Sequence, residues 1–479
     1  MEQLLQLFAQ WAGEPCDQCL ALSAGGSSRC YYRMKGPTRC CIGAIAIDVR
    51  ENEAFFAYTR HFRAKGMPVP ELYAVSDDRR HYLQQDLGDR TLYGILYEKK
   101  QQGRGFDAEM LALYRQALAD LALLQSAGAD IDFSLAYPRP AFDSCSIHWD
   151  LNYFKYLFLK LNHIDFDEER LENDFDDLTR YLLTADTNYF LYRDFNPRNI
   201  MVSGKAIDAA AKFQLYYIDY QGGRQGATQY DVASLLYSAK SEIPEALRGE
   251  LLTHYLDVRG IRGEARRQWL DYFWAYLLVR ILQTLGAYGY RGLHEHKPYF
   301  IESIPLAINN LRRLAEDHPL TIPLPELNRI IQQLTTNHPS PTSDTPTPDT
   351  LTVTVGSFSY KQGLPDDPTG NGGGHIFDCR ALPNPGRYPE YKCYTGKDRP
   401  VIEFLQQEPA VGQFLQHAKA IVAQSVDKYL ERHFTHLSVY FGCTGGQHRS
   451  IYCAEQLAAW LRETYPSLNV VVRHRERQE

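Results

Sequence analysis

The stretch 189–221 constrains this chain most, because it brings three side chains suited to metal or proton handling to the ends of two short predicted strands. It reads L-Y-R-D-F-N-P-R-N-I-M-V and, further on, Q-L-Y-Y-I-D-Y-Q, so Asp194 and Asn199 precede one strand and Asp219 ends the next. Phosphoryl transfer from ATP needs such a set: a carboxylate that orients the attacking hydroxyl, and an amide oxygen and a second carboxylate for Mg²⁺. Asp and Asn also form ordinary turns, but the order D-x-x-x-x-N, strand, hairpin, strand, D favours the chemical interpretation.

At these residues the sequence resembles the aminoglycoside phosphotransferase branch of the protein-kinase-like fold, whose catalytic loop usually reads H-x-D-x-x-x-x-N. Tyr192 stands here at the position of the usual His, which is a structural residue in that family. The resemblance implies that Asp194 is the catalytic base, that Asn199 and Asp219 bind Mg²⁺, and that ATP is the phosphoryl donor. The segment D-V-A-S-L-L-Y at Asp231 resembles the family's helix that braces the catalytic loop.

The composition fits this reading and excludes others. With 479 residues, 44% hydrophobic and 23% charged, the chain predicts two or three ordinary globular domains. It has no apolar run long enough to cross a membrane and begins M-E-Q-L-L-Q-L-F, without a basic leader, so we expect a cytosolic protein without a membrane partner. The ten irregularly spaced cysteines suit a reducing compartment, and a net charge of −7 argues against binding nucleic acid over the whole surface.

Near the start, C-L-A-L-S-A-G-G-S-S-R-C-Y-Y-R-M predicts a strand, a Gly-rich turn and a strand, the shape of a loop that covers a nucleotide. Gly25, Gly26, Ser27 and Ser28 could offer backbone N–H groups to phosphate, and an ordinary hairpin is the alternative. The resemblance narrows here to the bacterial anomeric sugar kinases that phosphorylate N-acetylmuramate or N-acetylglucosamine at carbon 1. Those proteins have a Ser-rich loop followed by an Arg- and aromatic-rich strand.

The sequence departs from the kinase pattern at the cation that neutralises the phosphates. Protein kinases carry a Lys on the third strand, whereas C-C-I-G-A-I-A-I has none. We therefore expect Arg29, Arg33 or Lys35 to take this part in ATP binding. Glu53, which opens the predicted helix 53–64, is the expected ion-pair partner, and a solvated carboxylate favoured by the helix dipole is the alternative.

Two further segments suggest contacts to ATP and to the acceptor. Gln85 and Leu87 lie in Y-L-Q-Q-D-L-G-D, which resembles the family's hinge to the adenine edge, or forms a plain turn. The segment I-H-W-D-L-N-Y-F sets His148, Asp150 and Asn152 among large apolar residues, where the anomeric sugar kinases have an acidic, aromatic helix that faces the sugar. Aromatic faces stack on pyranose rings while carboxylates and amides meet hydroxyls; a core helix rich in Tyr and Phe is the alternative.

The composition changes abruptly at residues 335–350, T-T-N-H-P-S-P-T-S-D-T-P-T-P-D-T. Pro, Thr, Ser and Asp cannot build a core, so this segment predicts an extended linker. The apolar-periodic helices before it predict an α-rich second lobe of the first domain. We therefore expect a kinase-like domain at 1–334 and a separate domain at 351–479.

The second domain has its own candidate site. Its strand H-L-S-V-Y-F runs into G-C-T-G-G-Q-H-R-S and a helix, and such a turn presents N–H groups and a helix's positive end to an anion. Arg449 could add a bidentate clamp. The alternative is a strand–helix turn that uses Gly only for tight packing.

Residues 351–479 resemble the C-terminal domain of the RNase adapter protein RapZ through F-D-C-R-A-L-P-N-P, Y-T-G-K-D-x-P-V and G-C-T-G-G-x-H-R-S. That domain binds glucosamine 6-phosphate and a small regulatory RNA. The resemblance implies a sugar-phosphate pocket lined by Asp378, Arg380, Thr444, Gly445, Gly446, His448, Arg449 and His474. RapZ has a P-loop N-terminal domain, and the absence of G-x-x-x-x-G-K-[ST] here means that the adapter role does not come with the domain.

Two alternatives concern the same domain. Cys443 to Arg449 also fits C-x-x-x-x-x-R, the signature of cysteine phosphatases, in which a thiolate attacks phosphorus. An RNA partner is left open but has no support from charge, because residues 351–479 carry 14 Lys and Arg against 13 Asp and Glu.

The predicted fold class is thus an α+β bilobal protein-kinase-like (aminoglycoside phosphotransferase) domain followed by a separate α/β RapZ C-terminal-like domain. The predicted function is ATP- and Mg²⁺-dependent phosphorylation of an amino sugar or cell-wall sugar at its anomeric hydroxyl, with a second domain that senses a sugar phosphate. The competing class is a regulator, an RNA- or protein-binding adapter with a weak or inactive kinase domain. Intact Asp194, Asn199 and Asp219 favour the enzyme, and the missing third-strand Lys favours the regulator.

Overall fold

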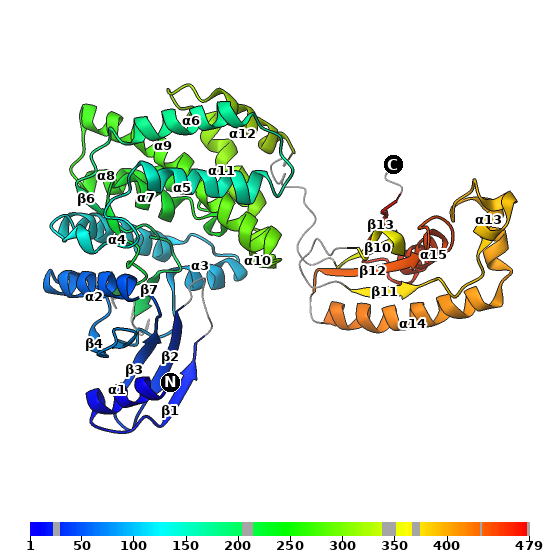
Figure 1. The fold of residues 1–479 in the computed structure, drawn as a ribbon, viewed down its shortest axis with the longest axis horizontal. Helices are drawn as coiled ribbons and strands as arrows, with labels where there is room; N and C mark the ends of the chain where they lie inside the picture. Colours follow the sequence, from blue (N-terminus) through cyan, green and yellow to red (C-terminus); the bar gives the residue numbers. More distant parts are fainter. Residues whose placement is uncertain (23–28, 204–213, 338–350, 366–373, 432–433, 477–479) are drawn as a thin grey trace. The chain divides into compact units, whose positions relative to one another are not determined.

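The computed structural model describes residues 1–22, 29–203, 214–337, 351–365, 374–431 and 434–476 (Figure 1). The chain divides into two compact units, Met1–Glu295 with Glu302–Pro339 and His296–Ile301 with Ser340–Glu479. Each unit has its own hydrophobic core. Among the described residues, no helix is long and apolar enough to cross a bilayer.

A five-stranded antiparallel sheet forms the smaller lobe of the first unit, with strand order β1-β2-β3-β5-β4. Its elements are α1 (Glu2–Ala12), β1 (Gln18–Ala21), β2 (Cys30–Lys35), β3 (Cys40–Ile45), α2 (Val49–Ala64), β4 (Leu72–Val75) and β5 (His81–Gln84). Helix α1 covers part of the sheet because its apolar stripe, which includes Leu4 and Phe8, packs on Met34 and Leu83. Helix α2 contributes Phe55 and Phe56, which pack against Tyr82.

Helices build the larger lobe. They are α3 (Leu92–Gln101), α4 (Ala108–Ala127), α5 (Ser144–Phe154), α6 (Glu168–Leu182), α7 (Gln229–Leu236), α8 (Glu245–Val258), α9 (Gly263–Tyr288), α11 (Ile304–Asp317) and α12 (Pro325–Asn337). The single-turn helix α10 (Pro298–Ile301) precedes α11 in the chain and belongs to the segment grouped with the second unit. The long helix α9 packs against α5, α7 and α11 and so forms the centre of this lobe. Helix α12 continues to Asn337 and so includes residues 335–337, the first three of the segment expected to be a linker.

Two small antiparallel ribbons lie at the junction of the lobes and carry the central motif. Strand β6 (Tyr189–Leu191) pairs with β9 (Arg224–Gly226), and β7 (Ile200–Ser203) pairs with β8 (Gln214–Tyr217). The loop between β6 and β7 therefore begins beside the turn that follows β8. This pairing is what brings the two ends of the motif together.

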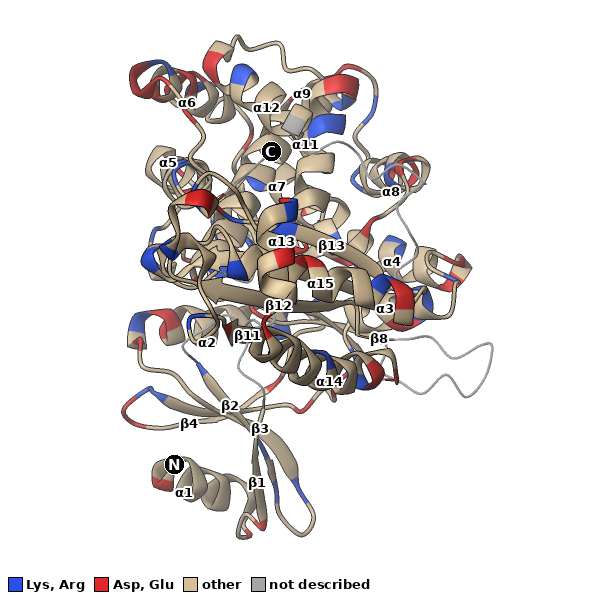
Figure 2. Ribbon diagram, turned by 90° about the vertical axis from the view of Figure 1, so that its right-hand side faces the viewer, with Lys and Arg blue, Asp and Glu red and all other residues tan. Residues whose placement is uncertain are grey.

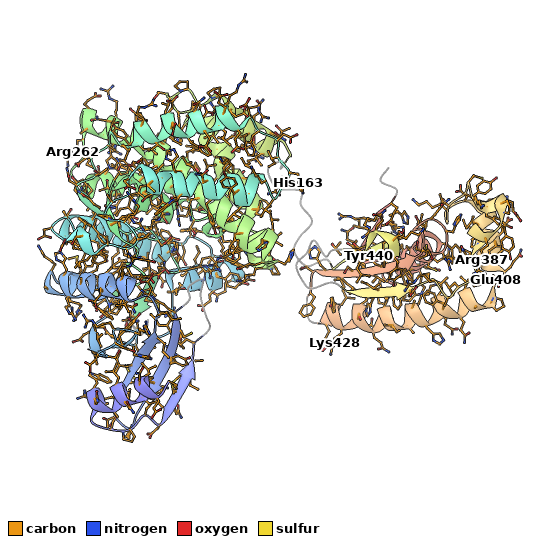
Figure 3. All side chains as sticks on the ribbon, viewed as in Figure 1. His163, Arg262, Arg387, Glu408, Lys428 and Tyr440 are labelled. Carbon is orange, nitrogen blue, oxygen red and sulfur yellow. The ribbon has the colours of Figure 1, made fainter. Side chains whose placement is uncertain are left out.

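The second unit contains a four-stranded parallel sheet of order β11-β12-β10-β13. Its elements are β10 (Thr352–Ser359), β11 (His375–Asp378), α13 (Arg399–Gln406), α14 (Pro409–Glu431), β12 (His436–Cys443), α15 (Arg449–Thr464) and β13 (Asn469–His474). Helix α15 packs on β10, β12 and β13. Gly356 in β10 leaves room for the ring of Tyr440 on β12, which Figure 3 labels.

This architecture confirms the predicted fold class: a bilobal kinase-like unit followed by an α/β unit with a parallel sheet. The helix expected at 53–64 begins four residues earlier, at Val49, because Asp48 caps it by accepting hydrogen bonds from the N–H groups of Arg50 and Glu51. In the second unit α13 ends at Gln406 and α14 starts at Pro409, a residue that suits the first position of a helix.

Candidate functional site

A cavity of about 520 Å³ lies between the five-stranded sheet and the two ribbons. Polar and charged side chains from both lobes line it together with aliphatic ones: Leu22, Arg29, Tyr31, Arg33, Ile42, Glu51, Phe55, Pro70, Gln84, Gln85, Asp86, Leu87, Gly88, Asn199, Met201, Ile218, Asp219 and Gln221. A cavity lined by both aliphatic and charged side chains suits a nucleotide, whose base is flat and whose phosphates are anionic.

The catalytic-loop residues meet at the end of this cavity. The Nδ2 of Asn199 donates to the backbone oxygen of Asp194 at 2.9 Å and to Oδ2 of Asp219 at 3.1 Å. Burial, with a contribution from the nearby Asp194, raises the pKa of Asp219, and Gln221 donates to its other oxygen at 2.7 Å. The structure thus brings together the three residues that the sequence placed five and twenty positions apart.

Oxygen ligands for a hard cation are present here. Both hydrogen bonds from Asn199 use its amide nitrogen, so its amide oxygen stays available beside the carboxylate of Asp219. Within the described ranges no group of three or more His, Cys, Asp or Glu side chains is placed to hold a metal. Two protein oxygens nevertheless suit Mg²⁺, which keeps several waters and takes further ligands from phosphate.

Tyr192 replaces the usual His of this loop and is fully packed. Its hydroxyl donates to the backbone oxygen of Ile218 at 2.5 Å, which ties the catalytic loop to the strand that delivers Asp219. The ring lies edge-on to Phe195 and Tyr220. The phenol of Tyr192, in place of an imidazole, therefore makes the hydrogen bond that connects the catalytic loop to the neighbouring strand.

Asp231 holds the start of the same loop from beneath. Its carboxylate accepts the N–H groups of Tyr192 at 2.8 Å and Arg193 at 2.9 Å, and Gln125 donates to it as well. Arg193 has a φ of 83°. Such a backbone is uncommon for a residue with a side chain, and the two hydrogen bonds to Asp231 stabilise it.

On the sheet side, Arg29 lines the cavity and is paired with an acidic side chain of α2. Its Nη2 lies 3.3 Å from Oε2 of Glu51 in α2, and its side chain is 2% exposed. The prediction that Glu53 pairs with this cation was wrong, because Glu53 pairs with Arg79, with 2.9 Å between Nη2 of Arg79 and Oε2 of Glu53. In α2, Glu51 lies one turn before Phe55 on the cavity side, whereas Glu53 lies on another face of the helix.

Of the other residues expected to bind the nucleotide, Arg33, Gln85 and Leu87 line the cavity. Arg33 lines it but is held by Asp86, at 2.7 Å, and Asp89, at 2.8 Å, so its charge is already paired. Gln85 and Leu87 follow β5 along the cavity wall, as expected of a hinge, and the N–H of Gln85 donates to Glu71. Gly25, Gly26, Ser27 and Ser28 lie outside the described residues.

The structure does not join His148, Asp150 and Asn152 into one sugar-facing surface. The carboxylate of Asp176 in α6, a helix whose acidic residues Figure 2 shows in red, accepts a hydrogen bond from Nε2 of His148 at 2.9 Å. Asp150 points the other way and binds Arg193 through both carboxylate oxygens. Residues 148 and 150 differ by about 200° around a helix, which is why they separate. The buried amide oxygen of Asn152 has no hydrogen-bond partner among the residues that the structure describes.

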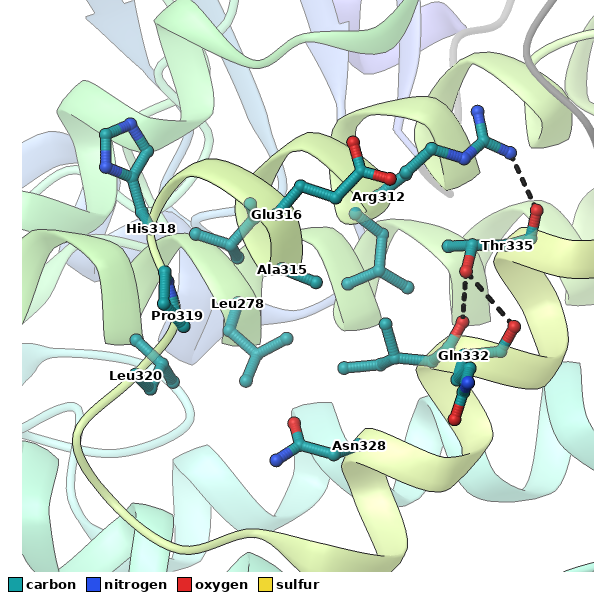
Figure 4. Close-up of a pocket in the computed structure, with 13 residues that line it drawn as sticks. Leu278, Arg312, Ala315, Glu316, His318, Pro319, Leu320, Asn328, Gln332 and Thr335 are labelled. Atoms are coloured by element: carbon teal, nitrogen blue, oxygen red, sulfur yellow. Dashed lines mark hydrogen bonds between the residues drawn. The ribbon is translucent and has the colours of Figure 1, made fainter.

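A second hollow of about 360 Å³ lies between α9, α11 and α12 (Figure 4). Thr335 closes one end, where its backbone oxygen accepts from Arg312 at 2.8 Å. At the other end His318 stacks on Trp274, with ring centroids 3.5 Å apart. None of the predicted catalytic or metal-binding residues lines it, so it is separate from the candidate active site.

In the second unit the predicted sensor residues gather at the carboxyl edge of the parallel sheet. Asp378 ends β11, Thr444 to Gly446 follow β12, and His474 ends β13. Parallel strands end on one side, so these segments meet there, as the hydrogen bond from Ser359 Oγ to the oxygen of Thr444 shows. Arg380 is exposed at this edge, where its Nη2 lies 2.7 Å from Oδ2 of Asp378 and its guanidinium stacks on Tyr360 at 3.9 Å.

Besides the paired Asp378 and Arg380, three further predicted sensor residues have structural partners instead of open positions. Arg449 is 4% exposed, and its Nη1 donates to the backbone oxygens of Arg380 and Leu382. His448 is hydrogen bonded to the oxygen of Tyr391, and His474 lies between Ser357 and Glu455. The direct clamp expected from Arg449 is therefore absent from this structure, because the side chain holds the loop that carries Arg380.

Sequence reasoning missed Glu51 and Arg280. Glu51 could have been found from Asp48, because a good N-cap residue at this position predicts that α2 starts at residue 49 and therefore includes Glu51. Arg280 approaches Asp194 from α9, with Nη1 3.5 Å from Oδ1, and no local pattern connects these two residues.

A bilobal scaffold with a carboxylate and an amide–carboxylate pair at the end of its interlobe cavity defines a kinase-like phosphotransferase. The model of the phosphotransferase enzyme family matches residues 19–270. Because this match covers more than half of the chain, the chain belongs to the phosphotransferase enzyme family. The model of the RapZ C-terminal domain matches residues 351–478.

Similar proteins fall into two groups. A nucleotide-binding protein of Acidovorax sp. (strain JS42) is 40% identical over 129 residues, 27% of this chain and 42% of that protein. One from Aromatoleum aromaticum is 42% identical over 125 residues, 26% of this chain and 40% of that protein. The chain thus spans about two fifths of the length of these curated relatives.

Among solved structures, Plasmodium vivax ethanolamine kinase has a TM-score of 0.44 at 12% identity and covers 61% of this chain and 82% of its own. A putative aminoglycoside phosphotransferase from Ralstonia eutropha has a TM-score of 0.40 at 14% identity and covers 70% of this chain and 94% of its own.

Proposed function

We propose that this protein is an ATP- and Mg²⁺-dependent kinase that phosphorylates an amino sugar or a related cell-wall sugar at its anomeric hydroxyl. The observation that carries the proposal is the cluster of Asp194, Asn199 and Asp219 at the end of a cavity that also contains Arg29 and Glu51. The family supports a phosphotransferase, and the sugar acceptor rests on the resemblance of the Ser- and Arg-rich segment before β2 to the anomeric sugar kinases.

Each residue then has a chemical part. The carboxylate of Asp194, with a side chain 48% exposed, accepts the proton of the acceptor hydroxyl as it attacks. Asn199 and Asp219 hold Mg²⁺ through oxygen atoms, and Arg29 contacts the phosphates while Glu51 fixes its position. Held there, the metal would supply positive charge that neutralises the phosphate oxygens of ATP.

We also propose the division 1–334, 335–350 and 351–479, with the last part as a module that binds a hexosamine phosphate without hydrolysing it. Strand β10 begins at Thr352, and the RapZ C-terminal match begins at residue 351. The Gly-rich turn at 444–446 and the exposed Arg380 support an anion site at the sheet edge. The thiol of Cys443 is buried against Ser450, which favours binding over thiolate chemistry.

A coupled assay tests the kinase. Purified full-length protein is given ATP, Mg²⁺ and a panel of amino sugars and aminoglycosides, and ADP release is followed with and without each acceptor. We expect acceptor-dependent ADP release with an amino sugar, and mass spectrometry should find one added phosphate on its anomeric oxygen. Acceptor-dependent turnover only with aminoglycosides, or none at all, contradicts the proposal.

A further inference from the structure

A buried ion pair involves the residue that immediately precedes the proposed base Asp194. The guanidinium of Arg193 binds both carboxylate oxygens of Asp150, with 2.6 Å between Nη1 and Oδ2. Asp150 belongs to α5, and the two side chains are 17% exposed for Arg193 and 6% for Asp150. A bidentate pair between a guanidinium and a carboxylate fixes orientation as well as distance. Asp150 therefore determines where the side chain of Arg193 lies.

Other side chains enclose the same guanidinium. Its Nη1 donates to the hydroxyl of Tyr230 at 2.9 Å, and that hydroxyl donates to Oδ2 of Asp150 at 3.3 Å. The rings of Phe142 and Tyr230, both buried, have their centroids 5.0 and 5.1 Å from the guanidinium carbon. A carboxylate, a hydroxyl and two aromatic faces thus form one binding place for this cation.

Arg193 is held at its backbone as well as at its side chain. Its N–H donates to Asp231, and its φ of 83° lies in the left-handed region. Such a backbone costs free energy in a residue with a side chain, so it persists only where the surrounding structure fixes it. Asp231 of α7 fixes one end of the residue and Asp150 of α5 fixes the other. The peptide that leads to Asp194 is held between them.

Asp150 has no direct route to the reacting groups. Within the described part of the chain, the residues that line the nucleotide cavity do not include it. Its side-chain partners are Arg193 and Tyr230. An effect of Asp150 on catalysis must therefore pass through the position of Arg193.

The charge of Arg193 makes this position matter. Burial acts to lower the pKa of Arg193, but Asp150 first, and then Tyr230 and Asp194, raise it above its ordinary value, so the guanidinium also feels the charge of Asp194. A buried cation that loses its partner is costly. Without Asp150, the carboxylate of the next residue, Asp194, is the remaining anion for it to approach. A base that is paired in this way attracts a hydroxyl proton less strongly.

We propose that Asp150 is a positioning residue for phosphoryl transfer: it binds the guanidinium of Arg193, keeps this cation away from Asp194, and so leaves the base free to meet the acceptor hydroxyl. This inference rests on the proposed kinase function. It differs from the role expected from the sequence, in which Asp150 contacts the sugar. A sugar ligand acts on the KM for the acceptor, whereas a positioning residue acts on kcat.

The test begins with Asp150→Asn, which keeps the shape of the side chain and removes its charge. The acceptor is N-acetylmuramate or N-acetylglucosamine, whichever the full-length protein phosphorylates faster. We expect kcat to fall by about ten- to a hundredfold, because small displacements of a reacting group have effects of this size. The KM values for ATP and for the acceptor should stay close to those of the wild type.

A second variant, Asp150→Asn with Arg193→Met, tests the route of the effect. It removes both members of the ion pair, so no cation is left at position 193 to approach Asp194. Replacing both partners of a buried pair by uncharged groups also costs less than removing one. We therefore expect kcat of the double variant to recover at least part of the loss. A residue that contacts the sugar could not be rescued by a change at Arg193.

Glu172→Gln is the matched control, because Glu172 pairs with Lys155, a buried cation of the same helical lobe that is 2% exposed. Its kcat should equal that of the wild type. Three results would overturn the proposal: an unchanged kcat in Asp150→Asn, a raised KM for the acceptor with kcat unchanged, or equal losses in the single and double variants. Should Asp150→Asn not fold, Asp150→Glu, which keeps the charge but moves the carboxylate, takes its place with the same expected outcome.

A second measurement separates this inference from the kinase proposal. If the wild type phosphorylates no acceptor, the kinase proposal fails by itself, and hydrogen exchange of the catalytic loop, followed by mass spectrometry, decides the role of Asp150. The N–H groups of Tyr192 and Arg193 donate to Asp231, so a loop that is held should exchange them slowly. Faster exchange in Asp150→Asn but not in Glu172→Gln supports the positioning role. Equal exchange in the wild type and Asp150→Asn refutes it.

Discussion

The guanidinium of Arg29 lies 3.3 Å from the carboxylate of Glu51, across the cavity wall between the start of β2 and the first turn of α2. Protein kinases form this contact with a Lys on the third strand and a Glu of the helix. Here the cation precedes the second strand, and the carboxylate still comes from the helix. The ion pair is therefore retained although the lysine is not, which favours an active enzyme over an inactive regulator.

This pair predicts a sharp difference between two glutamates that are two residues apart. Glu51→Gln should raise the KM for ATP by about tenfold, because Arg29 loses the charge that fixes it. Glu53→Gln, whose carboxylate pairs with Arg79 away from the cavity, should leave this KM unchanged and serves as the control. Steady-state kinetics at a saturating acceptor concentration measure both, and equal effects would contradict the assignment.

Replacement of the proposed base gives the second prediction. Asp194→Asn should lower kcat by at least a hundredfold, since an amide cannot accept the acceptor's proton. Nucleotide binding should persist, because Asp194 does not line the cavity. Single-turnover assays with calorimetric titration of ADP separate the two, and turnover within about tenfold of wild type would refute the role of Asp194.

The third prediction concerns the metal. Asn199→Ala and Asp219→Ala each remove one oxygen ligand, so the Mg²⁺ concentration for half-maximal activity should rise in both variants. Gln221→Ala is informative beside them, because Gln221 only orients Asp219, through a 2.7 Å hydrogen bond; its effect should be smaller. Unchanged Mg²⁺ titrations in the first two variants would remove both residues from the metal site.

The hydroxyl of Tyr192 provides a prediction on stability. Tyr192→Phe deletes the hydrogen bond to Ile218 and leaves a buried carbonyl without its donor, which should cost about 1–3 kcal/mol of unfolding free energy. Urea unfolding of the full chain should show a lower midpoint for the kinase-like unit. A midpoint identical to that of the wild type would mean that the hydrogen bond contributes nothing to holding the loop.

The last prediction concerns the C-terminal module. Arg380→Ala should weaken binding of a hexosamine phosphate by about tenfold or more, because an exposed, Tyr360-stacked guanidinium is the cation best placed to meet it. Cys443→Ser should bind as the wild type does. Calorimetry on the full chain measures both affinities. Phosphate release that disappears in Cys443→Ser would instead show that the loop is catalytic.

Local patterns predicted the catalytic loop well, because Asp194 and Asn199 share one loop and Asp219 ends the strand of the adjoining hairpin. The sequence also predicted the fold class of both parts of the chain. Glu53 was chosen over Glu51 because the predicted start of α2 at residue 53 left Glu51 outside the helix, and helix ends are the least certain part of such a prediction.

Other parts of the site could not be read from the sequence. Asp150 looked like a sugar ligand, but its role is decided by Arg193, which belongs to a distant segment. Arg449 fitted an anion clamp by spacing, yet its burial directs it to the carbonyls of Arg380 and Leu382. Such partners come from tertiary packing, and no periodicity reports them.

The phenol at position 192 has a consequence for the pH range of the enzyme. A histidine at this position would change its charge near neutral pH. Burial raises the pKa of Tyr192 well above its usual value, so the side chain stays neutral throughout the physiological range. Acidification or alkalinisation of the cell therefore does not change the protonation of the hydroxyl that donates to Ile218 from the catalytic loop.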